Sequence, residues 1–367
     1  VVLISVGTIL PSITARFVID EITAGSLATL LPFGILVGSI VFGPVVDRYG
    51  YKNMLIICSL LVLIGIEGIA YAKEFYVLQA AIFLIGFGGG VLNGGTNSLV
   101  ADISDEGKGA KLSLLGVFFG IGALGMPALL GALSNYYEYD SILAGVGLFV
   151  LLPILYFLFI KFPEAKQPQG LPIKKGIGLI KESSLLLLGL ILFFESGLEG
   201  IVNNWTTTYL INDLKTKPDN ALFALSYFVI GMTVTRLLLG GLLRKLSSYK
   251  VLYVSIIIAF GGAIILSIAS TYAIAVTGLV LLGIGFAASF PVVLGYVGDI
   301  YKQLSGTAFS IALVIALTGN MILNYTTGVI AQTFGIKYFT SVLFLSLILM
   351  TVVLFFTLKN ISEKTKI

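Results

Sequence analysis

The segment Gly43-Pro44-Val45-Val46-Asp47-Arg48-Tyr49-Gly50-Tyr51-Lys52 organises this sequence. It places three charged residues in a glycine-punctuated turn between two apolar segments, at about 25–46 and 53–72. Each apolar segment has about the 20 residues that an α-helix needs to cross a lipid bilayer. The sequence therefore predicts that this turn connects two membrane helices at the bilayer surface.

The composition of the whole chain is that of a membrane protein. Of its 367 residues, 57% are hydrophobic and 11% are charged, which is far from the usage of soluble domains. The chain has no histidine and one cysteine, Cys58, so we expect no disulfide framework, no metal site and no cofactor. The basic residues are scattered in short loops, which argues against binding of nucleic acid. The glycine clusters do not form a nucleotide fingerprint, so neither ATP-driven transport nor an enzyme is predicted.

Apolar segments recur along the chain and predict an all-α membrane protein with twelve transmembrane helices. We interpret the first segment, 1–15, as a helix whose beginning is missing, because it is too short to span the bilayer fully. Residues 162–183 contain prolines and lysines and are predicted to form a cytoplasmic linker between two six-helix bundles, 1–161 and 184–367. The other segments are expected at about 25–46, 53–72, 76–101, 111–134, 141–160, 184–211, 219–243, 249–270, 272–298, 303–331 and 336–358.

The two halves of the chain look like copies of each other. The segment from Leu84 to Asp102 aligns with the segment from Leu281 to Asp299 at an offset of 197 residues. The same offset carries Gly43 onto Gly240. A single shift that aligns separate helices predicts two pseudo-symmetric bundles.

Loop charges predict the orientation. Lysine and arginine are concentrated in the loops on the side of the linker, and basic loops remain in the cytoplasm. Both termini and the linker are therefore expected in the cytoplasm, and the bacterial inner membrane is the predicted location.

The turn between 43 and 52 resembles the signature loop between the second and third helices of the major facilitator superfamily. The usual pattern is Gly, three residues, Asp-Arg, one residue, Gly and a basic pair. Here Tyr51 stands at the first basic position, and only Lys52 of the pair is kept. The resemblance covers nearly the whole chain and implies a monomeric twelve-helix transporter that works by alternating access.

The resemblance also implies gating roles for the residues of the turn, Gly43, Asp47, Arg48, Gly50 and Lys52. We expect Asp47 to cap or face a positive helix end, and Arg48 to pair with Asp102 at the end of the fourth helix. In the second half, Arg236 and Asp299 are expected to form a comparable pair. The alternative is that these charges only enforce the topology.

Two carboxylates within a predicted span are candidates for proton coupling. Glu195 and Glu199 lie four residues apart near the middle of segment 184–211, so they share one helix face. Two acids in hydrocarbon cannot cheaply both be ionised, and an acid that holds a proton there suits a proton carrier. The alternative is a protonated Glu that only fixes helix packing. Glu67, in the outer part of another span, is expected to snorkel or to form a structural hydrogen bond.

Amide side chains at helical spacing are candidates for substrate binding, because amides donate to and accept from sugar hydroxyls. The lone tryptophan could stack on a pyranose ring or belong to the interfacial aromatic belt. Asparagines in spans can also simply hold helices together. In a two-bundle carrier such residues are expected at the midplane between the halves. The candidates are Asn93, Asn97, Asn203, Asn204, Trp205, Asn320 and Asn324.

The segments around Asn93 and around Phe118-Phe119-Gly120, together with Glu195, Glu199 and Trp205, resemble the fucose/proton symporter branch of bacterial sugar transporters. In the best-known members of that branch a Glu stands where Asn93 stands here. Because Asn93 cannot titrate, we hypothesise that Glu195 or Glu199 carries the proton.

The predicted function is symport of a neutral monosaccharide or polyol with protons. Sodium as the coupling ion, an uncoupled facilitator, a proton-antiporting exporter of drugs or apolar metabolites, and a transport-inactive membrane sensor are the alternatives.

Overall fold

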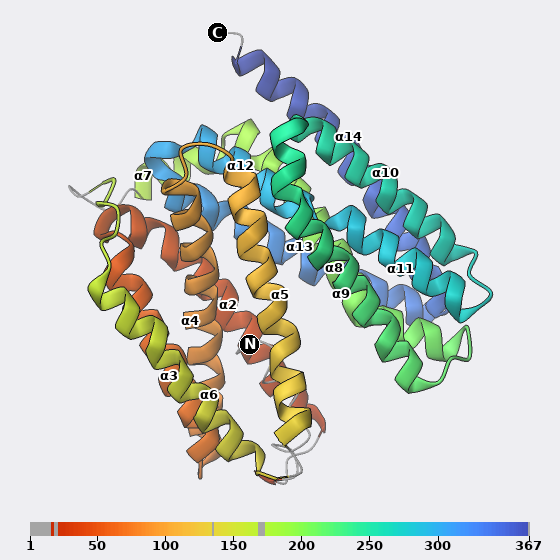
Figure 1. The fold of residues 1–367 in the computed structure, drawn as a ribbon, viewed down its shortest axis with the longest axis horizontal. Helices are drawn as coiled ribbons and strands as arrows, with labels where there is room; N and C mark the ends of the chain where they lie inside the picture. Colours follow the sequence, from red (N-terminus) through yellow and green to blue (C-terminus); the bar gives the residue numbers. More distant parts are fainter. Residues whose placement is uncertain (1–15, 18–20, 134–135, 168–172, 366–367) are drawn as a thin grey trace. The chain divides into compact units, whose positions relative to one another are not determined.

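The computed structural model describes residues 16–17, 21–133, 136–167 and 173–365, and all regular structure within these ranges is helical. Among the described residues, ten helical spans are long and apolar enough to cross a membrane. Figure 1 shows the helices, whose bounds are α2 (Glu21–Tyr49), α3 (Tyr51–Tyr71), α4 (Phe75–Asp102), α5 (Lys108–Leu133), α6 (Tyr139–Phe159), α7 (Ile173–Ile180), α8 (Ser183–Asn212), α9 (Pro218–Lys245), α10 (Ser248–Ser267), α11 (Tyr272–Phe286), α12 (Ser289–Ile300), α13 (Ser305–Phe334) and α14 (Phe339–Thr365).

These helices match the predicted apolar segments from 25 onward, and the predicted first segment, 1–15, lies outside the described residues. The structure differs from the prediction in two places. The predicted linker contains the short helix α7. The predicted segment 272–298 is divided between α11 and α12 at Ala287 and Ala288, because Pro291 has no N–H to donate to the carbonyl of Ala287.

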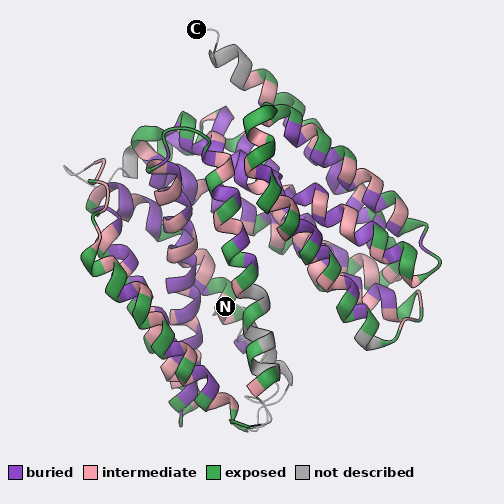
Figure 2. Cartoon of the chain, in the orientation of Figure 1, coloured by how far each residue is buried: buried purple, intermediate pink, exposed green. Residues whose placement is uncertain are grey.

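Exposed side chains on the spans are largely apolar, as expected where a helix faces lipid. On α6, the residues buried among the described ones are Ile142, Leu143, Gly147 and Ile154. Figure 2 shows that much of the α6 ribbon is exposed or half-buried. Its exposed side chains include Leu148 and Phe149. A soluble helix would carry polar residues on such a face.

The chain folds into two compact units. Among the described residues, the first comprises those within 1–103, 118–176 and 302–310, and the second comprises those within 104–117, 177–301 and 311–367. These units depart from the predicted halves in two places. The beginning of α13 packs in the first unit, and the beginning of α5 packs in the second.

Equivalent helices pack together within each unit. In the first unit α4 packs against α2 and α3, and α3 packs against α6. In the second unit α11 packs against α9 and α10, and α10 packs against α14. This is the order that the repeat in the sequence predicts, because the offset carries each helix of the first set onto its counterpart in the second.

Glycine lets α2 and α4 approach closely. A Cβ atom on Gly34 would lie 2.7 Å from the carbonyl oxygen of Phe83 and 2.8 Å from the backbone nitrogen of Phe87. Backbone atoms cannot move aside as the end of a flexible side chain can. The missing side chain is therefore part of the helix contact.

Gly34→Ala should lower the free energy of unfolding by about 1–3 kcal/mol through overpacking. The matched control is Gly145→Ala on α6, where an added Cβ meets no atom within 4 Å. Thermal unfolding in detergent should show a lower midpoint for Gly34→Ala and an unchanged one for Gly145→Ala. Equal midpoints for the two variants would contradict the packing argument.

Candidate functional site

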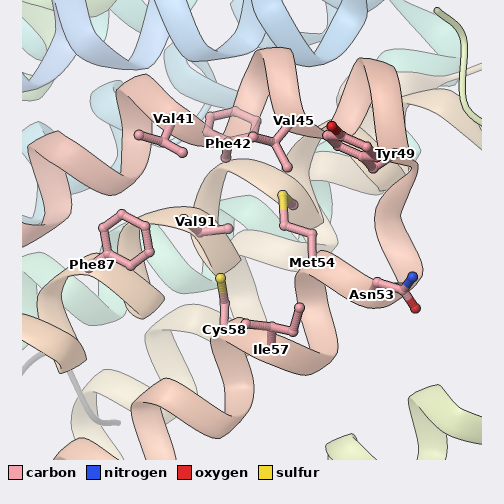
Figure 3. A pocket seen from close by; sticks show the side chains of 10 residues that line it. All are labelled: Val41, Phe42, Val45, Tyr49, Asn53, Met54, Ile57, Cys58, Phe87 and Val91. Carbon is pink, nitrogen blue, oxygen red and sulfur yellow. The ribbon is translucent and has the colours of Figure 1, made fainter. Parts of the chain in front are cut away.

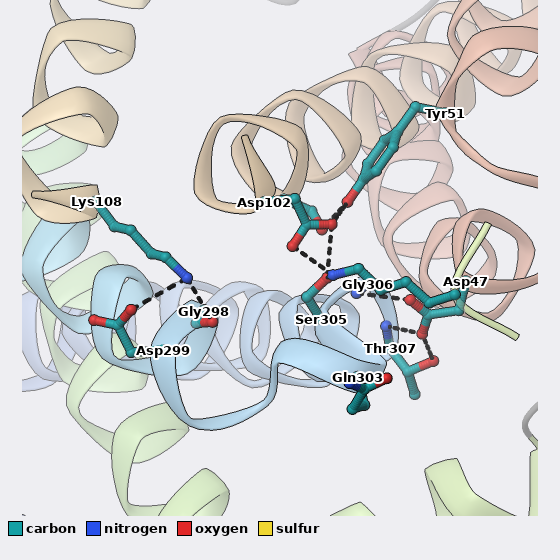
Figure 4. A network of polar contacts seen from close by, with 12 residues as sticks. Asp47, Tyr51, Asp102, Lys108, Gly298, Asp299, Gln303, Ser305, Gly306 and Thr307 are labelled. Carbon is teal, nitrogen blue, oxygen red and sulfur yellow. Dashed lines mark hydrogen bonds and ion pairs between the residues drawn. The ribbon is translucent and has the colours of Figure 1, made fainter. Parts of the chain in front are cut away.

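Asp47, in the turn that organises the sequence, caps a helix. Its side chain is 1% exposed. One carboxylate oxygen accepts a hydrogen bond from the backbone N–H of Gly306 at 3.0 Å. The other accepts from the N–H of Thr307 at 2.8 Å and from its hydroxyl at 2.5 Å (Figure 4). Because the first N–H groups of a helix lack internal partners and carry partial positive charge, the carboxylate stabilises the beginning of α13.

Gly43 and Gly50 serve this contact through their lack of a side chain. A Cβ on Gly43 would lie 2.5 Å from the carbonyl oxygen of Gly306, so α2 can reach the first turn of α13 only with glycine here. Gly50 joins α2 to α3 with a φ of 76°, a conformation that other residues rarely adopt. The hydroxyl of Ser310 donates to the carbonyl of Ser39 beside them.

Asp102, at the end of α4, is bound by residues other than its predicted partner, Arg48. Its carboxylate pairs with Lys166 of the linker at 2.6 Å and accepts hydrogen bonds from Tyr51 at 2.5 Å and Ser305 at 3.0 Å (Figure 4). Tyr51 thus donates to this acid from the position where the family pattern has a basic residue. Lys166 supplies the cation.

The predicted pair of Arg48 with Asp102 is wrong. The guanidinium of Arg48 instead lies over the ring of Tyr49, with its central carbon 4.7 Å from the ring centroid. Lys52 donates to the carbonyl of Leu158 at the end of α6, at 2.8 Å. The gating role expected for the residues of the turn stays a prediction.

The predicted pair of Arg236 with Asp299 is also wrong. Asp299 pairs with Lys108 at 3.1 Å, and Lys108 also donates to the carbonyl of Gly298 at 2.9 Å. Arg236 lies nine residues, about 13 Å, before the end of α9, whereas Asp299 lies at the end of α12. The Nε of Arg236 donates instead to the carbonyl of Ala287, at 3.5 Å, which is the carbonyl that Pro291 leaves without a helical partner.

Glu195 is a buried acid without a hydrogen bond in the described part of the chain. It lies in the middle of α8, is 0% exposed, and has no hydrogen-bond partner for either carboxylate oxygen. The charged groups that act on it are Glu199, one turn along α8, and Arg236 of α9. Both belong to the second unit, as Glu195 does.

The amides of α8 and α13 form a continuous chain of hydrogen bonds in the second unit. Asn204 donates to the side-chain oxygen of Asn324 at 2.9 Å. Asn324 donates to the side-chain oxygen of Asn320 at 3.2 Å and to its backbone carbonyl at 2.9 Å. Asn320 donates to the backbone carbonyl of Ser196 at 2.7 Å. These amides therefore hold α8 and α13 together, which was the alternative to ligand binding in the sequence analysis.

The remaining candidates lie on both units. Asn97 on α4 of the first unit donates to the backbone and side-chain oxygens of Asn93, at 2.8 and 3.3 Å. Asn203 donates to the backbone carbonyl of Glu199 at 2.9 Å. The edge of the Trp205 ring packs against Gly328 of α13, and its buried N–H has no partner among the described residues. The structure thus gathers Asn203, Asn204, Trp205, Asn320 and Asn324 with Glu195 and Glu199 on α8 and α13.

The side chain of Glu67 does not extend freely toward the membrane surface. One of its carboxylate oxygens is buried and lacks a hydrogen bond in the described ranges. A Cβ atom on Gly147 of α6 would collide with this oxygen, so the acid lies between α3 and α6. The described residues contain no group of three or more Cys, Asp or Glu that could hold a metal ion.

Residues 2–322 and 207–366 match the family described as Major Facilitator Superfamily. The chain belongs to this superfamily and is a multi-span membrane transporter rather than an enzyme. It is 26% identical over 343 residues to the glucose/mannose transporter GlcP of Bacillus subtilis (strain 168), covering 89% of this chain and 83% of GlcP.

A solved structure and a second relative are also similar. The Escherichia coli fucose:proton symporter FucP superposes with a TM-score of 0.81 at 18% identity, over 97% of this chain and 96% of FucP, which shows the shared fold. A multi-drug resistance efflux pump PmrA homolog of Lactococcus lactis is 24% identical over 227 residues, 60% of this chain and 56% of that protein.

Asp47→Ala should lower the free energy of unfolding by about 2 kcal/mol, because it removes the cap of α13. Asp105→Ala is the control, since Asp105 is exposed in the loop between α4 and α5. Thermal unfolding in detergent measures both. If Asp105→Ala lowers the midpoint as much as Asp47→Ala does, the cap is not what stabilises the protein.

Proposed function

We propose that this transporter moves a neutral monosaccharide or related polyol together with protons, by alternating access, in the bacterial inner membrane with both termini in the cytoplasm. The observation that carries the proposal is Glu195, a fully buried acid without a hydrogen bond in the described residues of the span. An ionised carboxylate in such surroundings costs several kcal/mol, so the neutral acid is the form that suits this site.

That cost gives the coupling a physical basis. When the site opens to water, Glu195 can release its proton, because water then solvates the carboxylate. Symport requires that the sugar-loaded carrier cross with Glu195 protonated and that the empty carrier return with Glu195 ionised. On this proposal the loaded, closed site accepts only the neutral acid, because burial of the carboxylate is costly there, and Arg236 is the counter-charge in the empty carrier. Each cycle then moves one proton with one sugar, and uptake follows the proton gradient.

Glu199 and Arg236 influence how readily Glu195 keeps its proton. Glu199 repels a second negative charge on the same helix face, and Arg236 attracts one from α9. Arg236 therefore acts as the counter-charge that Glu195 meets when it is ionised, and Glu199 favours retention of the proton. This division gives both acids, which the sequence singled out as a pair, separate parts in the cycle.

The sugar specificity rests on the amides and on similarity. Asn204 is exposed at one end of the amide chain and can exchange its hydrogen bond for one to a substrate hydroxyl. Trp205 lies next to it and offers an aromatic face. GlcP, which is named a glucose/mannose transporter, and FucP, which is named a fucose:proton symporter, support a monosaccharide.

Export of drugs with proton antiport is the second candidate, because the chain is also similar to the PmrA homolog. The two candidate functions require different chemistry at the substrate site. A sugar carrier requires polar groups with free hydrogen-bonding capacity near the substrate, whereas a drug exporter requires an apolar surface.

Glu195→Gln should abolish accumulation of sugar against a gradient while sparing sugar exchange across the membrane, because the amide cannot carry a proton. Uptake of labelled glucose, mannose or fucose into proteoliposomes under a proton gradient measures accumulation, and its uptake into vesicles preloaded with the unlabelled sugar measures exchange. Glu67→Gln is the matched control, since Glu67 is a span acid of the first unit, and it should accumulate sugar like the wild type. Concentrative uptake by Glu195→Gln would remove this residue as the coupling acid, and dependence of uptake on sodium would replace the proton.

Addition of the transported monosaccharide should change the fluorescence of Trp205, the single tryptophan, in a saturable way. Purified protein in detergent is titrated with the sugars and with a lipophilic cation at two pH values. Trp205→Phe should lose the signal and thereby prove its origin. A response to the lipophilic cation together with none to any sugar would favour the exporter.

A further inference from the structure

An apolar groove runs along the first unit beside the turn that organises the sequence. Its volume is about 350 Å³. Val41, Val45 and Tyr49 follow one another along α2 on one side, Ile57 of α3 lies opposite, and Phe87 lies on α4 (Figure 3). Because α2 and α3 each pack on α4 far more than on each other, a trough opens between them with α4 as its floor.

The groove lies at the depth of lipid tails. Tyr49 is at the end of its span, and Val41 is eight residues, about 12 Å, further along the helix. The side chains of Val41 and Ile57 are 41% and 55% exposed. In a protein that crosses the membrane, an exposed apolar trough at this depth meets acyl chains.

A second hollow adjoins the groove at Tyr49, which lines both. Its volume is about 360 Å³, and residues 49–52 and 160–165 line it. Lys52 and Lys161 contribute cations and Glu164 contributes a carboxylate. Arg48 stacks on Tyr49, the residue that lines both hollows. Lys52 has three N–H groups and spends one of them on Leu158, so two can bind a ligand.

We propose that the two hollows together bind one anionic phospholipid. The phosphate headgroup lies between Lys52 and Lys161, and one acyl chain lies in the trough between α2 and α3. The excess of two cations over one carboxylate in the lining selects an anionic headgroup over a zwitterionic one. The apolar trough selects a lipid over a soluble anion. This site is separate from the proposed sugar and proton sites and does not depend on them.

The test compares retention of phosphatidylglycerol and phosphatidylcholine by the purified protein in neutral detergent, measured by native mass spectrometry. The wild type should retain phosphatidylglycerol about tenfold better. Lys52→Ala with Lys161→Ala should abolish this preference. Lys250→Ala with Lys302→Ala is the matched control, because both lysines are exposed and line neither hollow, and it should keep the preference. Equal retention of the two lipids, or equal loss in both double variants, would overturn the proposal.

A second measurement addresses the acyl chain without any substitution. Phosphatidylglycerol that carries a photoactivatable diazirine in its acyl chain is crosslinked to the wild-type protein, and the labelled peptides are identified. Labels should concentrate on Val41–Tyr49, Asn53–Cys58 and Phe87–Val91. Even labelling of lipid-facing positions such as Phe149 and Ile257, or displacement of the lipid by inorganic phosphate, would overturn a site that includes the groove.

Discussion

A polar group inside the hydrocarbon layer has no water to bind, so the chain itself must supply every partner. This constraint explains the all-helical backbone in the described ranges. It also explains why the hydroxyls of Thr235, Thr327 and Thr357 donate to the carbonyl one turn earlier on their own helices. The amides of α8 and α13 satisfy one another for the same reason. Against this background, the carboxylate of Glu195 is informative, because both of its oxygens are buried without a partner among the described residues, whereas Glu67 leaves only one oxygen in this state.

The ends of the helices follow the same constraint at the bilayer surface. Asp47 supplies acceptors for the first N–H groups of α13, and the internal repeat carries Asp47 onto Arg244. Arginine cannot accept those hydrogen bonds, so Arg244 cannot form the equivalent cap. The repeat does keep an acid at the ends of α4 and α12. Asp102 is bound by Lys166 of the linker, whereas its counterpart in the repeat, Asp299, is bound by Lys108. Equivalent acids therefore pair with unrelated parts of the chain.

The sequence predicts the helices well because membrane spans are encoded by length and hydrophobicity, which are local properties. The predicted segment 272–298 is continuous and so misses the break at Ala287, because hydrophobicity does not register the helical hydrogen bond that Pro291 removes. Partners of the charged residues are harder to predict. Lys166 and Asp102 are 64 residues apart, and Lys108 and Gly298 are 190 apart, so the partner depends on the packing of whole helices. The long side chains of these lysines also reach acids that Arg48 does not reach, because Arg48 is stacked on Tyr49. The capping role of Asp47 could be predicted, because few other roles are open to an acid in a turn next to a helix end.

The asparagines show how structural and functional roles can coexist. Asn324 donates both of its N–H groups within the chain, whereas Asn320 donates one of its two, to the carbonyl of Ser196. Asn204 is the exposed end of that chain, and the other end is the carbonyl of Ser196, adjacent to Glu195. A hydroxyl that takes the hydrogen bond of Asn204 leaves the oxygen of Asn324 unpaired. On the proposed mechanism the amides of α13 then exchange partners, and Asn320 connects them to the turn of α8 that carries Glu195. On the proposed mechanism, this connection gives substrate binding a physical route to the acid that holds the proton, because both lie on one hydrogen-bonded helix pair.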